Sequence, residues 1–203
     1  YLRTTSTAMD TLHPEDRHRR RRIPPPDIPA PSVGEPTAAR AWLDTERATL
    51  VQVTVHAARH GRPTYATQLS ATLFRYLDIG GHYPEAITIH SYARDAAHRI
   101  GDRAAEATAL NHLGTVHVNQ SRYQEAADHL LKALVLFRQM GDRAAQGRAL
   151  GNLAIIRDAQ GRYREAIGLY QQELALFRET GDLAAKANAL TALGDTEERL
   201  GHY

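Results

Sequence analysis

The apolar positions in the second half of the chain recur at the spacing of amphipathic helices. Within residues 101–140, Ala107, Leu110, Leu113, Gly114 and His117 fall at helical spacing and share one helix face. A Ser-Arg turn at 121–122 is followed by a second apolar face, made by Tyr123, Ala126, Ala127, Leu130, Leu131, Leu134 and Phe137. Each segment has one apolar stripe and one polar face, which predicts pairs of antiparallel helices.

This pattern repeats with a fixed period. The run Gly-Asp-Arg-Ala-Ala at 101–105 recurs at 141–145, an offset of 141 − 101 = 40 residues. The same offset relates the tyrosines at 83, 123, 163 and 203 and the leucines at 73, 113, 153 and 193. A period of this length indicates a solenoid, in which each unit buries its apolar face only against its neighbours.

Gly141 and Asp142 are predicted to separate one unit from the next. Glycine adopts the left-handed angles that end a helix, and aspartate accepts the free amides at the start of the following helix. Small residues are expected where two helix backbones approach closely, at Gly114, Ala126, Ala154, Ala166 and Gly194.

These positions resemble the tetratricopeptide repeat, in a 40-residue variant of a motif that is usually about 34 residues long. One copy matches the family pattern at Leu110, Leu113, Gly114, Ser121, Tyr123, Ala126, Leu130 and Ala133, and the next at Leu150, Leu153, Ala154, Gly161, Tyr163, Ala166 and Tyr170. Glu173 departs from the last small position, and leucine replaces the usual first aromatic residue. The resemblance covers Pro63 to Tyr203 and implies an all-α fold, a right-handed α-solenoid of antiparallel helix pairs.

The predicted organisation has three parts. Residues 1–13 are a helical tail or the end of a preceding domain, since the chain begins with Tyr1, and residues 14–35 are a linker rich in arginine and proline. Residues 36–203 form the solenoid: a half repeat at 37–60, repeats at 63–100, 101–140 and 141–180, and a truncated repeat at 181–203. Trp42 is expected to cap the first apolar face.

A second resemblance concerns residues 19–26, Arg-Arg-Arg-Arg-Ile-Pro-Pro-Pro, and the segment Ala39 to Leu50. Together they look like the junction before the C-terminal repeats of actinobacterial antibiotic-regulatory activators. Those proteins join a winged-helix domain and a nucleotide-binding NB-ARC domain to a repeat sensor. The resemblance implies that any ATPase domain lies outside this chain.

Composition narrows the function classes. The 203 residues contain 25 Lys+Arg, 23 Asp+Glu and no cysteine, which excludes disulfides and thiolate chemistry and favours a cytoplasmic setting. No apolar run approaches the ~20 residues of a membrane span. Residues 1–40 carry seven arginines and five acids, so the remainder balances at 18 basic and 18 acidic residues. A nucleic-acid role is therefore confined to the run Arg17–Arg22.

Motifs for catalysis are missing from the sequence. No GxxxxGK[ST], GxSxG or HExxH pattern occurs, so neither an enzyme nor a cofactor is predicted. His56 and His60, one helical turn apart, could hold a metal only with a third ligand, and a structural role at a helix end is favoured. The tyrosines at 83, 123 and 163 are expected to pack between helices rather than to stack on a ligand.

The remaining candidate is the face of the first helix in each unit, which lines the concave groove in the family. Its outward positions correspond to Arg75, Asp78, Thr108, Asn111, Thr115, Asn119, Arg148, Asp158, Asp195 and Arg199. Such amides, hydroxyls and mixed charges suit an extended peptide or a partner helix, although a solvated face remains an alternative. Thr115 and Ile155 replace the asparagines of the clamp that holds chaperone carboxyl termini, which argues against a chaperone adaptor.

The sequence thus predicts a non-catalytic protein-interaction module, the sensor or regulatory arm of a bacterial signalling or transcriptional regulator. Its partner would be a protein or peptide in the groove, including other domains of the parent chain. A stand-alone peptide receptor and a nucleic-acid-binding fragment that uses the arginine run are the alternatives.

Overall fold

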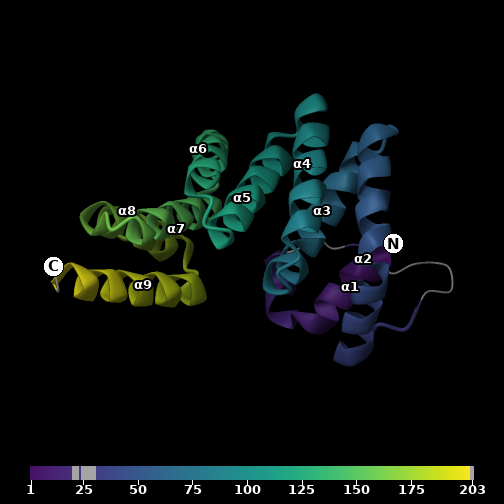
Figure 1. The fold of residues 1–203 in the computed structure, drawn as a ribbon, viewed down its shortest axis with the longest axis horizontal. Helices are drawn as coiled ribbons and strands as arrows, with labels where there is room; N and C mark the ends of the chain where they lie inside the picture. The colour runs from purple at the N-terminus through teal and green to yellow at the C-terminus, as the bar shows by residue number, and fades with distance from the viewer. Residues whose placement is uncertain (20–22, 24–30, 202–203) are drawn as a thin grey trace. The chain divides into compact units, whose positions relative to one another are not determined.

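The computed structural model describes residues 1–19, 23 and 31–201, and its regular structure there is entirely helical. The helices are α1 (Leu2–Leu12), the 3-10 helix η1 (Pro14–Arg19), α2 (Pro36–Arg59), α3 (Pro63–Ile79), α4 (Tyr83–Arg99), α5 (Arg103–Asn119), α6 (Tyr123–Met140), α7 (Arg143–Ala159), α8 (Tyr163–Thr180) and α9 (Leu183–Gly201) (Figure 1). The predicted all-α class is confirmed. None of the described helices has the length and apolar character needed to cross a bilayer.

The chain divides into two compact units, Tyr1–Ala109 and Leu110–Tyr203. In unit 1, α2 packs against α3 and α4, α3 packs against α4, and α1 lies on α2 and α3. In unit 2, α6 packs against α7, α7 against α8, and α8 against α9. This consecutive packing within each unit is typical of a solenoid.

The helix ends confirm the predicted signals. Gly141 follows α6 with a φ of 70°, in the left-handed region that suits glycine. The side chain of Asp142 then accepts a hydrogen bond of 2.9 Å from the amide of Ala145. Asp102 and Asp182 cap α5 and α9 in the same way, each at 3.0 Å from an alanine amide three residues on. The Gly-Asp pair therefore ends one unit of the repeat and begins the next.

The predicted apolar stripes form the core. Buried leucine, isoleucine and phenylalanine side chains line both units, among them Leu43, Leu50, Leu69, Leu73 and Ile89 in unit 1 and Leu113, Leu130, Phe137, Leu153, Ile156, Leu174 and Phe177 in unit 2. Close approach at the predicted small residues is confirmed at Gly114, where a Cβ would come within 2.5 Å of the Leu130 side chain. Close packing of α5 on α6 thus requires glycine at this position. The prediction is wrong at Gly194, where nothing lies within 4 Å of a Cβ.

The N-terminal region holds more structure than the predicted linker. Residues 14–19 form η1, and Val33 is buried, whereas most of the proline run lies outside the described residues. Trp42 on α2 stacks on Tyr1, with 6.4 Å between ring centroids. The first helix pair is therefore covered by the chain's own N-terminal residues.

Candidate functional site

In unit 2, polar side chains connect successive first helices. The amide of Asn152 on α7 donates a hydrogen bond of 3.0 Å to the Thr115 hydroxyl on α5. That hydroxyl in turn donates to the carbonyl of Asn111, at 3.1 Å, so it acts as both donor and acceptor. The pair fixes the spacing of α5 and α7 on this face.

A second polar group connects α7 with α9. Arg199 forms an ion pair with Asp158, whose Oδ1 atom is 3.0 Å from the Thr196 hydroxyl. Thr196 is buried and lies one turn after Ala192, whose carbonyl is 2.8 Å from the same hydroxyl. A single hydroxyl proton serves both acceptors. Asp158 and Arg199, both predicted on the outward face, therefore hold two first helices together.

In unit 1, the corresponding face of α3 is occupied. Arg75 reaches three residues from the segment after α1: its Nε atom donates to His13 at 3.2 Å, and its terminal nitrogens are 3.3 Å from Glu15 and 3.0 Å from Asp16. Partial burial, and then the Arg75 charge, lowers the pKa of His13, which is consistent with a neutral acceptor ring.

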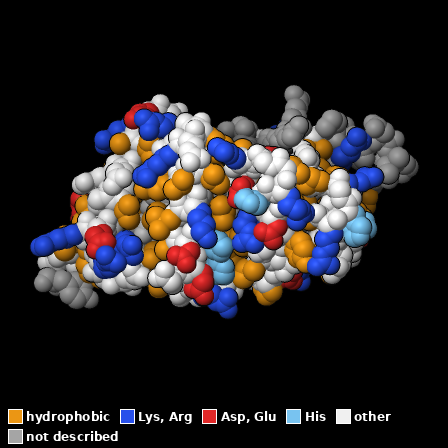
Figure 2. Space-filling model, turned by 90° about the horizontal axis from the view of Figure 1, so that it is seen from above, with side chains coloured by type: hydrophobic (Ala, Val, Ile, Leu, Met, Phe, Trp, Pro, Cys, Tyr) orange, Lys and Arg blue, Asp and Glu red, His pale blue; other side chains and the backbone are white. Residues whose placement is uncertain are grey.

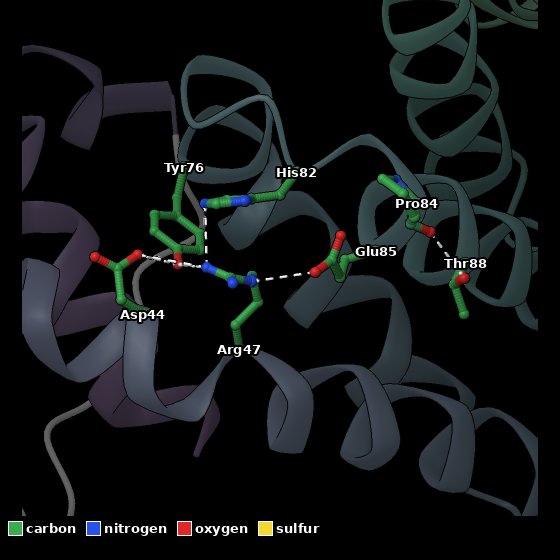
Figure 3. Close-up of polar contacts among 7 residues, drawn as sticks. All are labelled: Asp44, Arg47, Tyr76, His82, Pro84, Glu85 and Thr88. Carbon is green, nitrogen blue, oxygen red and sulfur yellow. Dashed lines mark hydrogen bonds and ion pairs between the residues drawn. The ribbon is translucent and has the colours of Figure 1, made fainter.

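A charged network connects the helices of unit 1 behind this face (Figure 3). Arg47 of α2 donates to Glu85 of α4 at 3.1 Å, and its Nη1 atom lies 3.3 Å from the His82 ring. Tyr76 of α3 donates 2.6 Å to Asp44. Burial first, and then Asp44, raises the pKa of Tyr76 to about 12, so the phenol keeps its proton. The network joins three helices, α2, α3 and α4.

Histidine pairs do not build a metal centre in the described part of the chain. No group of three or more His, Asp or Glu side chains there could hold an ion. His56 and His60 stack with 4.0 Å between ring centroids, and the His60 ring donates to the His56 carbonyl at 2.9 Å. This pair lies at the C-terminal end of α2, where histidine interacts favourably with the helix dipole.

Comparison with known proteins supports the repeat assignment in the second half of the chain. Residues 106–179 and 145–203 match the family described as Tetratricopeptide repeat. The match supports a tetratricopeptide repeat protein. Among curated proteins, none matches the chain. Of solved structures, the crystal structure of BtubC (BKLC) from P. vanneervenii is similar, with a TM-score of 0.66 and 16% identity over 98% of this chain and 83% of that chain. At that identity the likeness shows the fold alone.

The first-helix face of unit 2 differs from the sequence prediction at Asn111. Its side chain is only 8% exposed, although an outward position was expected. The position 40 residues on, Gly151, shows why: a Cβ there would lie 2.4 Å from the Glu173 carboxylate on α8. Position 111 therefore points toward its own second helix. The sequence held this signal, since 107, 111 and 114 share one helix stripe.

The other predicted positions differ in exposure. Those that face solvent are Arg75, Asn119, Arg148, Asp195 and Arg199, and those that are half-buried are Asp78, Thr108, Thr115 and Asp158. The Thr108 hydroxyl donates to the Ala104 carbonyl of its own helix, at 2.8 Å. Asn152, Thr196 and the N-terminal partners of Arg75 were missed. The first two are 37 and 38 residues from their partners, close to one repeat period, which is the signal that could have identified them.

Proposed function

We propose that this chain is a non-catalytic module that binds a protein or peptide through the first-helix face of its tetratricopeptide repeats. The observation that carries the proposal is the face of α5 and α7 in unit 2. Asn152 and Thr115 hold the two helices in register, while Arg148 and Ile155 remain exposed beside them. A cationic side chain next to an apolar one suits a peptide that carries both an acidic and an apolar group.

The surface charge agrees with selective protein contacts rather than with nucleic-acid binding. Lys and Arg side chains are interspersed with Asp and Glu on the face shown in Figure 2, and no single basic field covers the helices there. A protein that binds duplexes through phosphate contacts would gather its cations on one side.

The test replaces Arg148 and Ile155 together with alanine. We expect the variant to fold normally, because exposed substitutions usually change stability by less than about 0.5 kcal/mol. Its affinity for binding partners should fall at least about tenfold. Calorimetry measures this affinity with proteins that were first recovered by the wild-type chain. The matched control is Leu131→Ala with Val135→Ala, two exposed apolar residues on the second helix α6. If the control variant loses partner binding and the Arg148→Ala, Ile155→Ala variant keeps it, the binding site lies on α6.

Within this proposal, the chain acts as the regulatory arm of a bacterial signalling or transcriptional regulator. The support is the likeness of residues 19–26 and 39–50 to the junction in NB-ARC regulators. The coding sequence upstream of Tyr1 tests it. A GxxxxGK[ST] loop in a domain that precedes the repeats is the expected result, and a start codon a few residues upstream would instead favour the stand-alone receptor.

A further inference from the structure

The N-terminal segment is seated on unit 1 in the manner of a bound ligand. Helix α1 lies against both α2 and α3 (Figure 1), and its first amide donates 2.9 Å from Leu2 to the Tyr65 hydroxyl of α3. Ala8 and Met9 of this helix are fully buried. Arg75, on the predicted partner-binding face, contacts the residues that follow the helix: His13, Glu15 and Asp16. One helix and one acidic pair thus occupy this face.

From these contacts we propose that α1 and η1 are an internal ligand, and that a partner helix followed by two adjacent carboxylates binds the α2–α3 surface by displacing them. The inference rests on the proposed protein-binding function and names the chemistry of one partner. Its acidic pair replaces Glu15 and Asp16 at Arg75. Its helix replaces α1.

The composition of α1 favours displacement. Three of its six buried residues are the polar Thr4, Thr5 and Ser6, whereas most of the buried residues of α7 are alanine, leucine or isoleucine. Less apolar surface therefore returns to water when α1 leaves. The Thr5 hydroxyl donates to the Tyr1 carbonyl, at 2.9 Å, so this bond lies within the segment itself.

The chain length permits the movement without disturbing α2. Helix η1 ends at Arg19 and α2 begins at Pro36, so 16 residues, 20–35, connect them. Fully extended, a stretch of that length reaches about 50 Å. Helix α1 can therefore leave its surface while α2 remains in the core.

The seated segment also defines the partner. The buried positions Leu2, Thr5, Ser6 and Met9 follow the spacing i, i+3, i+4, i+7, with large apolar residues at the ends and small polar residues between them. The acidic pair starts three residues after α1 ends, at Glu15. A partner helix of about three turns with these features would make the same contacts with Tyr65 and Arg75.

The experiment uses a labelled synthetic peptide of residues 1–19, titrated into the full chain by fluorescence anisotropy. In the variant Glu15→Lys with Asp16→Lys, the internal copy is weakened and Arg75 is untouched, so we expect the peptide to bind at least about tenfold more tightly than to the wild type. Adding Arg75→Glu to that variant should reduce peptide binding by a similar factor or more, because the change removes the contact of the peptide while the lysines at 15 and 16 let the internal copy return. The matched control Arg164→Glu makes the same charge change at an exposed residue of α8 and should leave the peptide affinity unchanged.

A second measurement keeps the test independent of peptide affinity. Trp42, the one tryptophan of the sequence, stacks on Tyr1, so release of α1 should change its fluorescence. Amide hydrogen exchange in the Glu15→Lys, Asp16→Lys variant should lose protection at Leu2–Leu12 while α3 and α4 keep theirs. Protection of α1 equal to that of α3, or peptide binding that Arg75→Glu leaves unchanged in the Glu15→Lys, Asp16→Lys variant, would overturn the inference. If Arg148→Ala with Ile155→Ala loses natural partners and the variant with all three changes at 15, 16 and 75 keeps them, the proposed function stands and this inference fails.

Discussion

Both units contain packed helix pairs, but they differ in what covers the face of the first helices. In unit 1, the face of α3 is covered by α1 and η1, and Arg47 joins α2, α3 and α4 through charged contacts. In unit 2, a neutral pair connects α5 with α7 and an ion pair connects α7 with α9, while Arg148 and Ile155 of α7 remain exposed. A single repeat pattern therefore supports either a covered face or an open one, and the residues outside the repeat signature decide which.

The two units also bury titratable groups of different kinds, a histidine in unit 1 and a carboxylate in unit 2. In unit 1, His90 is fully buried, and burial lowers its pKa from 6.5 to about 3 while its Nδ1 atom lies 2.7 Å from the Ser70 hydroxyl. In unit 2, Glu173 lies over Gly151, and burial raises its pKa from 4.5 to about 7. The fold favours the neutral form of each group. Lowering the pH should therefore destabilise unit 1 through His90 and stabilise unit 2 through Glu173.

The largest effect should come from the shared core, where the comparison predicts no difference. Leu73 and Leu153 are buried and lie 80 residues, or two periods, apart. Replacing either with alanine should cost about 2–5 kcal/mol of unfolding free energy, because a cavity is left between helices. Urea melts followed by Trp42 fluorescence for unit 1 and by hydrogen exchange of α7 for unit 2 measure each cost. The exposed Leu190→Ala is the control, and a cost below about 0.5 kcal/mol for Leu153→Ala would contradict the repeat register.

A smaller effect, specific to unit 2, should follow Gly151→Ala. The added Cβ would meet the carboxylate end of the Glu173 side chain at 2.4 Å, so this side chain must shift, and Gly151→Ala should be about 1–2 kcal/mol less stable than the same change at an open site. Adding Glu173→Ala should remove most of this difference, because the pair then resembles Asn111 opposite Ala133 in the preceding repeat. Gly168→Ala on α8 is the control, since nothing lies within 4 Å of its Cβ, and there alanine should stabilise by about 0.5–1 kcal/mol. Equal losses at both glycines would place Glu173 elsewhere.

The pH dependence tests the second difference between the units. His90 has a lowered pKa in the fold, so its contribution to stability is complete above pH 6.5 and is lost as the pH falls toward 3, by up to about 1.4 kcal/mol per pH unit. Glu173 has a raised pKa, so its contribution is complete below pH 4.5 and is lost as the pH rises through 7. His117 in unit 2, whose pKa burial lowers, acts against Glu173.

Between pH 7.5 and 5, unit 1 should therefore become less stable while the Glu173 contribution to unit 2 increases. His90→Gln, which can still bond to Ser70, should reduce the loss in unit 1, and Glu173→Gln should remove the gain in unit 2. Hydrogen exchange of α4 and α8, corrected for the intrinsic pH dependence, measures each unit. Parallel pH profiles for Glu173→Gln and the wild type in α8 would show that this carboxylate does not titrate in the range.

The 40-residue period predicts the features that the repeats share, and it does not predict contacts made by residues outside the repeat pattern. Gly141, Asp142 and Leu113 follow from helix-end chemistry and from 3.6-residue spacing, both of which are local. The contact of Arg75 with His13 joins residues 62 positions apart that belong to different parts of the chain, so no repeat offset predicts it. Helix α1 has a weak apolar stripe, and its burial depends on the surface that receives it. Glu173 was recognised as an unusual residue, but its burial depends on the space left by Gly151.

The smallest effect concerns the polar pairs between helices, and salt separates a neutral pair of unit 2 from an ion pair of unit 1. Asn152→Ala should cost about 0.5–1.5 kcal/mol, because the Thr115 hydroxyl loses one partner on a half-buried face. A double-mutant cycle with Thr115→Val isolates the pair, and its coupling energy should be the same at about 0.05 M and 1 M salt, since both groups are neutral. The matched cycle in unit 1 uses Arg47→Met and Glu85→Gln, whose 3.1 Å ion pair is partly exposed and should weaken as salt screens it. A coupling between Asn152 and Thr115 that falls with salt would mean that charged neighbours such as Arg148 hold this face together, and the distinction between the units would then lie in their exposure alone.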